Sequence, residues 1–415
     1  MERLTRQKLA QAERCVAASG LDVWITFVRE TDEAADPVLP LLVEHGLVWQ
    51  SALLVTARGR KVAVVGNYDA EPLRQSGDWD EVIPYVQGIG AELRSTLDRL
   101  VPDSPRAPRL AVNWSLDDPK ADGLSHGMYR QLEELLRGTR FEGSLESAET
   151  IVSGLRSRKT RSELERIGEA IRWTDEIFRE LETEIVPGRT ERELFDFVQG
   201  RVRARDLDFA WDPAGDPIVN SGPASAVGHG APSETIRVEP GHIVHVDFGV
   251  RARGYASDLQ RCWYVADGRS STPPAKVRHA FRAVYDTISE GSRALRPGVE
   301  GWKVDEAARR FLVAAGYPEY LHALGHQVGR RAHDGGACLA PRWERYGRVP
   351  HLRVQEDEVY TLELGVMVDG HGYLGLEEMV RVTEDGCAWL SERQESLPVL
   401  GPPRAPAGAG RPVGP

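Results

Sequence analysis

The sequence predicts an α+β fold, in which a smaller α/β domain precedes a larger domain built on an antiparallel sheet. Two observations lead to this prediction. Helix-like and strand-like segments alternate through residues 1–155, which is typical of α/β domains. From Pro217 onward the pattern changes to strands joined by turns, interrupted by helices at 274–294 and 301–315. Helices that pack on an antiparallel sheet are typical of α+β domains, and a chain of 415 residues is long enough for both regions.

The N-terminal region contains the elements of a small α/β domain. An amphipathic helix over residues 3–18 is followed by Gly20, a suitable C-cap because glycine tolerates the left-handed conformation. The remaining predicted elements are strands at 21–27, 81–86 and 110–114, helices at 87–101 and 126–137, and a hairpin formed by 51–55 and 61–65.

A basic stretch from Arg156 to Arg161 separates the two regions. We interpret it as a solvated linker that leads into a helix over 162–184, rather than as a patch that binds nucleic acid. Residues 190–193 then have the form of a capping box and begin a helix that extends to Arg205. The predicted domains are 1–155 and 156–400, followed by a tail at 401–415 that is rich in proline and glycine and is expected to be disordered.

The overall composition weighs against several classes of function. The net charge is −11, whereas a domain that binds nucleic acid needs a basic face, so we expect no nucleic-acid partner. There is no run of about 18 apolar residues and no apolar stretch at the charged N-terminus, so we expect a cytoplasmic protein with no membrane partner. The cysteines lie far apart without a C-x-x-C pair, which favours free thiols over a zinc or redox site: Cys15, Cys262, Cys338 and Cys387.

A pair of aspartates lies in the first predicted hairpin of the second domain. Strands are expected at 243–250 and 255–265, and with a loop at 252–253 Asp247 faces Asp258 across the pair. Facing like charges repel each other and are costly to bury in an apolar sheet. A bound divalent cation removes both problems; the alternative is a pair of aspartates that face solvent.

A second hairpin presents a pair of glutamates. Strands at 359–366 and 376–382 flank a turn at 369–372, and Glu363 and Glu377 are symmetric about residue 370. They too can therefore face each other across an antiparallel pair.

His326 is the fifth candidate ligand. Its neighbours Gly325 and Gly329 allow a close approach of the backbone. A single histidine is more often a core residue, but four carboxylates and one imidazole together suit two divalent ions that share bridging oxygens. The sequence therefore predicts a metal site.

In these residues the sequence resembles the pita-bread metallopeptidases, which include methionine aminopeptidase, aminopeptidase P, prolidase and the related creatinase. The family's ligands run Asp, Asp, His, Glu, Glu, and the matching residues are Asp247, Asp258, His326, Glu363 and Glu377. Glu377 is favoured over Glu378 because the run at 379–386 matches the family in that register. The resemblance implies a creatinase-type N-terminal α/β domain followed by a pita-bread catalytic domain.

Three further histidines match residues that line the substrate pocket in the proline-specific members: His229, His322 and His333. There, such histidines bond the carbonyl of the cleaved peptide or the intermediate, and His322 or His333 is expected to stabilise the oxyanion. We therefore expect these histidines and Glu363 to take part in catalysis. The alternative for each histidine is a surface or core position.

The resemblance implies hydrolysis by a hydroxide that bridges two metal ions. Two divalent ions lower the pKa of a shared water toward about 7, and the resulting hydroxide attacks the peptide carbonyl. Glu363 is expected to be both a ligand and the general acid/base, while His326 ligates one of the metals. Oxygen-rich ligation favours manganese, with zinc or cobalt as alternatives.

One departure from the family concerns the substrate. Proline-specific members often carry an arginine two residues before the last glutamate, where this chain has Gly375. The expected activity on small peptides is that of an Xaa-Pro dipeptidase. The alternatives are an aminopeptidase P that acts on longer peptides, and a hydrolase or lyase of a small amide or osmolyte. A non-catalytic binding protein would have lost ligands, and none is lost. By resemblance we expect a homodimer.

Overall fold

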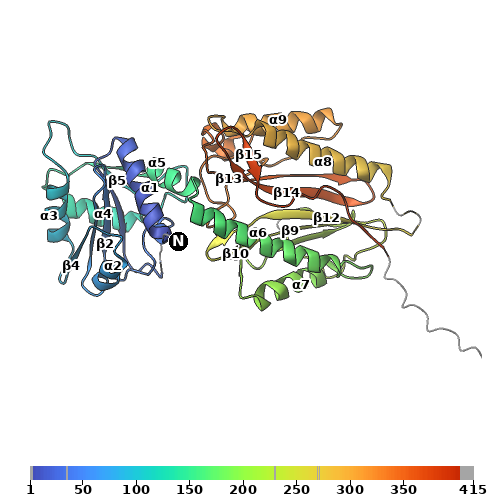
Figure 1. Ribbon diagram of the computed structural model, residues 1–415, viewed down its shortest axis with the longest axis horizontal. Coiled ribbons are helices and arrows are strands. Elements are labelled where there is room, and N and C mark those ends of the chain that lie inside the picture. The colour runs from blue at the N-terminus through green and yellow to red at the C-terminus, as the bar shows by residue number, and fades with distance from the viewer. Residues whose placement is uncertain (1–2, 34–35, 229, 269, 271, 402–415) are drawn as a thin grey trace, which may run out of the picture. The chain divides into compact units, whose positions relative to one another are not determined.

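A computed structural model describes residues 3–33, 36–228, 230–268, 270 and 272–401 (Figure 1). They form two compact units, and the chain passes from the first to the second between Ser162 and Glu163. The predicted disordered tail lies outside the described residues, except for Gly401.

The first unit is built on a six-stranded mixed sheet with the strand order β4-β3-β2-β1-β5-β6. The pairs β1–β2 and β2–β3 are antiparallel, whereas β3–β4, β1–β5 and β5–β6 are parallel. The strands are β1 (Val23–Val28), β2 (Ser51–Thr56), β3 (Lys61–Gly66), β4 (Glu81–Tyr85), β5 (Leu110–Val112) and β6 (Leu145–Ser147).

Helices cover both faces of this sheet. Along β1, Trp24 and Val28 belong to the apolar core shared with α1, α2 and α5, whereas Ile25 and Phe27 belong to the core shared with α3 and α4. This alternation follows from the two-residue period of a strand. The helices are α1 (Leu4–Ser19), α2 (Ala70–Ser76), α3 (Gly90–Leu100), α4 (His126–Leu136) and α5 (Glu149–Ser157), with a short 3₁₀ helix η1 (Leu39–Leu41).

The basic stretch at 156–161 leads into a helix, as predicted, but it is not a solvated linker throughout. Arg156 lies at the end of α5 and is only 3% exposed, and its Nη1 donates a hydrogen bond to the Pro37 carbonyl at 2.6 Å. Lys159 is also 3% exposed, and its Nζ donates to the Arg156 carbonyl at 2.6 Å. Long basic side chains can bury their aliphatic stems when backbone carbonyls accept bonds from their charged ends.

The second unit begins with two long helices, as the sequence predicts. The capping box is present at the start of α7: Thr190 accepts a hydrogen bond from the Glu193 backbone, and Glu193 accepts one from the Thr190 backbone. The helices are α6 (Arg161–Glu182), α7 (Glu191–Ala204), α8 (Ala275–Ala294) and α9 (Gly301–Ala314), with short 3₁₀ helices η2 (Glu344–Tyr346) and η3 (Val349–His351). No helix among the described residues is long and apolar enough to cross a membrane.

The main sheet of the second unit has the strand order β13-β14-β12-β9-β8, with β15 on β14 and β16 on β12. All of these pairs are antiparallel except β12–β16. The strands are β8 (Ile218–Ser221), β9 (Ile243–Phe248), β12 (Leu259–Val265), β13 (Val359–Val368), β14 (Gly372–Val382), β15 (Cys387–Trp389) and β16 (Val399–Leu400). A second, three-stranded sheet has the order β11-β10-β7 and consists of β7 (Asp208–Phe209), β10 (Val250–Ala252) and β11 (Tyr255–Ala256).

One face of the main sheet packs against α8 and forms the apolar core of this unit, which leaves the opposite face for other side chains. In Figure 1, α8 runs alongside β13 and β14. Even-numbered residues of β13, such as Leu362 and Leu364, pack into the same core as Val284 and Ile288 of α8. Odd-numbered residues of β13 and β14 therefore project from the opposite face.

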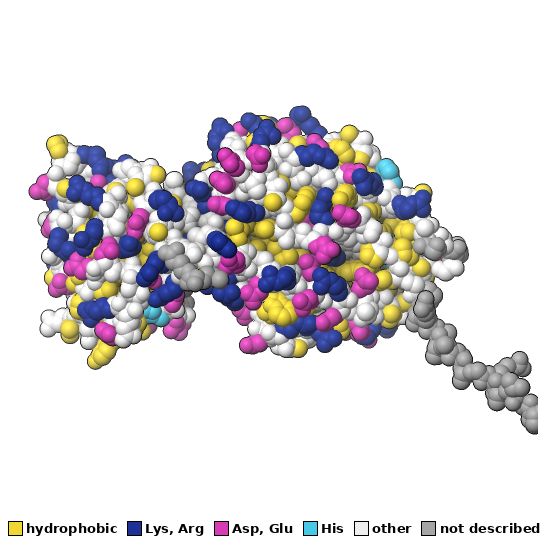
Figure 2. Space-filling view, in the orientation of Figure 1, with side chains coloured by type: hydrophobic (Ala, Val, Ile, Leu, Met, Phe, Trp, Pro, Cys, Tyr) yellow, Lys and Arg dark blue, Asp and Glu magenta, His cyan; other side chains and the backbone are white. Residues whose placement is uncertain are grey.

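On the face drawn in Figure 2, charges of one sign do not gather. Figure 2 shows Lys and Arg side chains interspersed with Asp and Glu over the visible face. All four cysteines have free thiols.

Candidate metal centre

Glu363 and Glu377 face each other across the β13–β14 hairpin, which confirms the predicted register. Both are odd-numbered and project from the face opposite the α8 core. The neighbouring Glu378 projects from the other face of β14 and accepts hydrogen bonds from Ser391 Oγ at 2.6 Å and the Gln394 backbone at 2.9 Å. Glu377 is thus the glutamate that lies beside Glu363.

Asp247 and Asp258 are not directly opposite each other, so the predicted register of this hairpin was wrong. Asp247 is paired with Gln260, and Asp258 lies in the break between β11 and β12. The loop is Arg253-Gly254, with φ values of 49° and 79°, as a two-residue turn of type I′ requires. The strands are also broken at 249 and at 257–258 into pieces that belong to two sheets.

Gln260 is a residue of the site that the sequence prediction missed. It is paired with Asp247 on β9 and, on its other side, with Glu377 on β14. Its Nε2 donates a hydrogen bond to Oε2 of Glu363 at 3.1 Å, and its Oε1 lies 2.9 Å from Nε2 of His245. The only available sequence signal was its position two residues after Asp258, which places both side chains on one face of an extended chain.

His326 reaches the carboxylates because its segment lies against β13. The Glu363 backbone donates to the Leu324 carbonyl at 2.7 Å, and the Thr361 backbone donates to the His326 carbonyl at 2.9 Å. A Cβ atom on Gly325 would overlap the Thr361 carbonyl, which explains the glycine. His326 Nε2 lies 3.4 Å from Oε1 of Glu363 and 3.7 Å from Oδ2 of Asp258.

The carboxylates and His326 fit a divalent cation. Ligand atoms of Asp258, His326 and Glu377 lie within 4.8 Å of one another. Oδ1 of Asp247 and both carboxylate oxygens of Glu377 are buried without a hydrogen-bond partner among the described residues. Buried carboxylate oxygens without donors are costly, and a cation would satisfy them.

The electrostatics lead to the same conclusion. Burial raises the pKa of Asp247, Asp258 and Glu377 well above the ordinary carboxyl range, and neighbouring carboxylates raise it further. Burial also raises the pKa of Glu363, but the hydrogen bond and charge of His326, together with other histidine charges, outweigh burial and hold it below its usual value. Without a cation these carboxylates cannot all ionise readily.

Two of the three predicted pocket histidines lie near Glu363. Positive charge on either His322 or His333 lowers the pKa of the Glu363 carboxyl. The His333 ring contacts that of His326, with centroids 4.1 Å apart at an interplanar angle of 71°. His229 lies outside the described residues.

A buried ion pair on α9 supports the segment that carries His322. Asp305 accepts hydrogen bonds from Arg309 Nε and Nη2, both at 2.9 Å, and from the Leu324 backbone at 3.1 Å. Arg309 Nη2 also donates to the His322 carbonyl at 3.0 Å. The pair therefore holds both ends of residues 322–324, and the sequence prediction did not include it.

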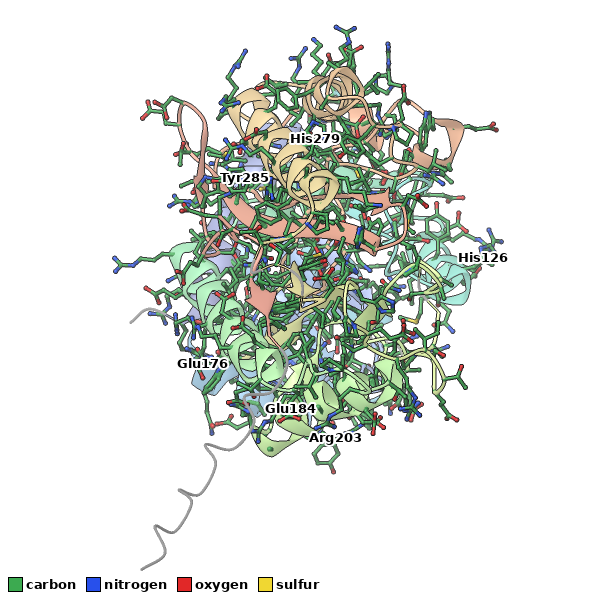
Figure 3. All side chains as sticks on the ribbon, turned by 90° about the vertical axis from the view of Figure 1, so that its right-hand side faces the viewer. His126, Glu176, Glu184, Arg203, His279 and Tyr285 are labelled. Atoms are coloured by element: carbon green, nitrogen blue, oxygen red, sulfur yellow. The ribbon has the colours of Figure 1, made fainter. Side chains whose placement is uncertain are left out.

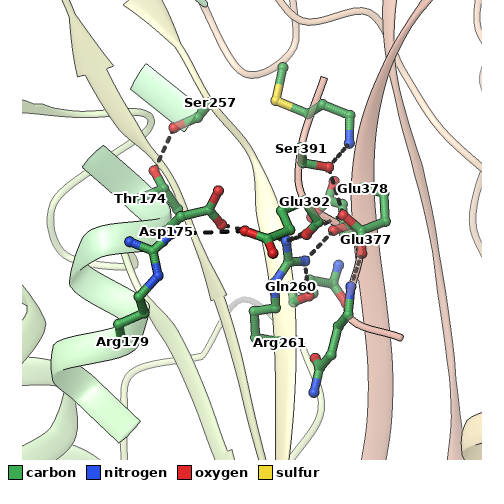
Figure 4. Close-up of polar contacts among 12 residues, drawn as sticks. Thr174, Asp175, Arg179, Ser257, Gln260, Arg261, Glu377, Glu378, Ser391 and Glu392 are labelled. Atoms are coloured by element: carbon green, nitrogen blue, oxygen red, sulfur yellow. Dashed lines mark hydrogen bonds and ion pairs between the residues drawn. The ribbon is translucent and has the colours of Figure 1, made fainter. Parts of the chain in front are cut away.

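A second polar cluster, centred on Arg261, supports the backbone of β14 at Glu377 (Figure 4). Arg261 Nη1 donates to the carbonyls of Gln260 at 2.9 Å and of Glu377 at 3.0 Å. Its Nη2 lies 3.3 Å from Glu378 and 3.6 Å from Asp175. Burial raises the pKa of Asp175 to about 6, although the charge of Arg261 opposes this shift. Arg261 thus joins β12 and β14 where they carry the site.

Three uncharged polar side chains, Asn220, His245 and Gln260, are linked by hydrogen bonds beside the carboxylates. His245 Nδ1 lies 3.1 Å from Oδ1 of Asn220, and its Nε2 lies 2.9 Å from Oε1 of Gln260. Burial lowers the pKa of His245 to about 4, so its ring is uncharged at neutral pH. A Cβ atom on Gly375 would lie 2.9 Å from this ring, 2.8 Å from Gln260 Oε1 and 2.7 Å from Cε1 of Tyr373.

Two other histidines, His126 and His279, lie on α-helices. Figure 3 labels His126 on α4 and His279 on α8. Nδ1 of His279 pairs with the Tyr317 hydroxyl at 3.1 Å. Neither histidine lies on the strands that carry the carboxylates.

Known proteins share this sequence pattern and this fold. The pattern of metallopeptidase family M24 matches residues 165–384, which is more than half of the chain. The Xaa-Pro dipeptidase of Pyrococcus furiosus is 29% identical over 275 residues, which cover 66% of this chain and 73% of the relative.

Two solved structures superpose over nearly the whole chain. The X-Pro aminopeptidase of Thermotoga maritima has a TM-score of 0.70 at 23% identity, covering 94% of this chain and 100% of that one. The dipeptidase of Mycobacterium ulcerans has a TM-score of 0.71 at 23% identity, covering 96% of this chain and 98% of that one. These likenesses confirm the predicted fold class.

Proposed function

Because the chain belongs to metallopeptidase family M24, we propose that it is a dinuclear metal-dependent peptidase that hydrolyses Xaa-Pro bonds, and that Xaa-Pro dipeptides are its first substrate class. The observation that carries this proposal is the convergence of Asp258, His326 and Glu377 within 4.8 Å. The unpaired oxygens of Asp247 and Glu377 support it. The named activity of the Pyrococcus furiosus relative supports the choice of substrate.

The proposed metal ligands are those predicted from the sequence: Asp247, Asp258, His326, Glu363 and Glu377. A set of four carboxylates and one imidazole favours manganese, with zinc or cobalt as alternatives. Bound divalent ions would supply a nucleophilic water at neutral pH and polarise the peptide carbonyl.

The chain's own residues have distinct proposed roles in this reaction. The lowered pKa of Glu363 keeps its carboxylate ionised at neutral pH, so it can take a proton from the attacking water and pass it to the leaving nitrogen. His322 and His333 lie near this carboxylate and are proposed to bind and orient the carbonyl oxygen. His229 is assigned the same kind of role by resemblance alone.

The proposal also covers the cellular location, the oligomeric state and the domains of the protein. We propose a cytoplasmic homodimer, with residues 1–155 as a creatinase-type domain and residues 156–400 as the catalytic domain. The four free thiols are compatible with a reducing compartment.

The surroundings of Gly375 favour a second candidate function, in which the substrate is not a free dipeptide. The space beside Gly375, where proline-specific relatives often carry an arginine, is filled by Tyr373, Gln260 and the neutral ring of His245. No lysine or arginine of the described chain forms an ion pair with the four site carboxylates. Substrates other than free dipeptides, such as longer peptides or a small amide, are therefore the alternative.

Product analysis by mass spectrometry tests the proposal. Manganese-reconstituted protein is incubated with Xaa-Pro dipeptides, Xaa-Pro-Yaa tripeptides, peptides that begin with methionine, and simple amides. Cleavage of the dipeptides supports the first candidate, and cleavage of the tripeptides alone supports an aminopeptidase. The peptidase proposal fails if no peptide is cleaved by protein whose metal content has been verified.

A further inference from the structure

Tyr373 has an unusual position beside the candidate metal centre. It lies on β14 opposite Met367 of β13, and the adjacent cross-strand pair on the same face consists of Gly365 and Gly375. A Cβ atom on Gly365 would overlap Cζ and the hydroxyl of Tyr373, and one on Gly375 would lie 2.7 Å from Cε1. The tyrosine ring therefore lies across the pair of glycines.

This position directs the hydroxyl toward the carboxylates. Beyond the glycines, the next cross-strand pair on the same face is Glu363 and Glu377. Burial raises the pKa of the Tyr373 phenol, and the charges of nearby groups, including Glu363, Asp247 and Glu377, raise it further. The His245 ring contacts the tyrosine ring edge-on, with centroids 4.9 Å apart at 86°, and holds it in place.

Tyr373 is half-buried, and its hydroxyl makes no hydrogen bond to another described residue. Other phenols of this unit donate to carboxylates: Tyr255 to Glu163, Tyr320 to Asp305 and Tyr360 to Glu358. A phenol with a free donor is available to a molecule that binds at the carboxylates.

We propose that Tyr373 is a further catalytic residue, whose hydroxyl donates a hydrogen bond to the carbonyl oxygen of the peptide bond that is cleaved. This inference rests on the proposed function, because a carbonyl that reacts at this site must lie against the carboxylates that Tyr373 faces. A donor at that oxygen stabilises the negative charge that develops on it during attack. No bond to Tyr373 forms or breaks in the step.

The Tyr373→Phe variant tests the proposal, because it removes the hydroxyl and keeps the ring on the glycines. With an Xaa-Pro substrate we expect kcat to fall by at least about tenfold and KM to stay within about twofold, since the bond strengthens in the transition state. Metal content and the thermal midpoint should not change. Tyr264→Phe is the matched control, because Tyr264 belongs to the α8 side of the sheet and its loss should leave kcat unchanged.

Binding supplies a readout that does not depend on turnover. Calorimetry on manganese-loaded protein compares a phosphinic Xaa-Pro analogue, which has an oxyanion at the carbonyl position, with a reduced-amide analogue, which has no oxygen there. Tyr373→Phe should weaken the phosphinate at least about tenfold and leave the reduced amide within about twofold.

The proposal for Tyr373 is overturned if the wild type cleaves Xaa-Pro substrates while Tyr373→Phe loses less than about tenfold in kcat. It is also overturned if both analogues weaken equally. Failure of the wild type to cleave any Xaa-Pro substrate instead overturns the proposed function, so the two failures are distinguishable.

Discussion

Gln260 donates a hydrogen bond from Nε2 to Oε2 of Glu363 over 3.1 Å. The bond crosses from β12 to β13, past the strand that carries Glu377. An uncharged side chain thus orients the proposed acid/base carboxylate. Residues that hold a metal ligand in place commonly affect metal affinity as strongly as they affect activity.

Gln260→Ala should weaken metal binding by about 10- to 100-fold, because Glu363 loses the donor that orients it. Calorimetric titration of metal-free protein with manganese measures the effect. Gln75→Ala is the matched control, since Gln75 is exposed on α2 and bonds only to Glu71. Unchanged manganese affinity in Gln260→Ala would contradict this role.

Removal of metal should make stability fall as pH rises. The raised pKa values of Asp247, Asp258 and Glu377 mean that the folded metal-free protein holds protons that the unfolded chain releases. Their contribution to stability is present below the ordinary carboxyl pKa of about 4 and is lost as pH rises from there through the folded values. Glu363 has a lowered pKa and opposes this trend, but it is one group against three.

Thermal midpoints across this pH range measure the effect in metal-free and manganese-loaded protein. The loaded protein serves as the control, because the cation stabilises the ionised carboxylates. The gap between the two midpoints should widen from about pH 4 toward neutrality. A constant gap would show that these carboxylates are not linked to metal binding.

The ion pair between Asp305 and Arg309 should contribute strongly to stability. Their side chains are 1% and 10% exposed, so Asp305→Ala leaves a nearly buried cation without its main partner and should cost about 3 kcal/mol in the free energy of unfolding. Chemical denaturation measures this cost. Arg310→Ala is the control on the same helix: Arg310 and Glu306 are 76% and 38% exposed, and its loss should cost less than about 0.5 kcal/mol. Equal losses in the two variants would contradict the argument.

A side chain at residue 375 should be poorly tolerated. In Gly375→Ala the new Cβ lies 2.7 Å from Tyr373 and 2.8 Å from Gln260, so both must shift, and the unfolding free energy should fall by about 1–3 kcal/mol. Metal affinity should fall with it, because Gln260 bonds Glu363. Gly127→Ala is the control, since a Cβ there meets nothing within 4 Å. A fully stable Gly375→Ala variant that binds metal normally would contradict this packing argument.

The parts of the site that the sequence predicts correctly depend on local patterns. Glu363 and Glu377 are symmetric about a glycine-containing turn, so their pairing follows from one hairpin. The Asp247 register depends instead on whether Arg253 adopts a positive φ, which is uncommon for a residue other than glycine. A shift of the loop by one residue placed Asp258 where Gln260 lies.

Other features depend on packing that no local pattern reveals. Arg156 and Lys159 are basic in sequence but buried, because distant and neighbouring carbonyls accept their hydrogen bonds. Gly375 stands where proline-specific members often carry an arginine, and in the structure Tyr373 and Gln260 fill the space beside it. Tyr373 lies on β14 and Gln260 on β12, so their packing against Gly375 can be recognised only when the two strands are placed side by side.

The presence of a two-metal site is tested by elemental analysis of the purified, manganese-reconstituted chain, for the wild type and for Glu377→Gln. We expect two ions per chain in the wild type and a loss of bound metal in the variant, because Glu377 offers two buried carboxylate oxygens without a partner among the described residues. A wild-type chain that binds no divalent metal, or a Glu377→Gln variant that binds as much as the wild type, would contradict it.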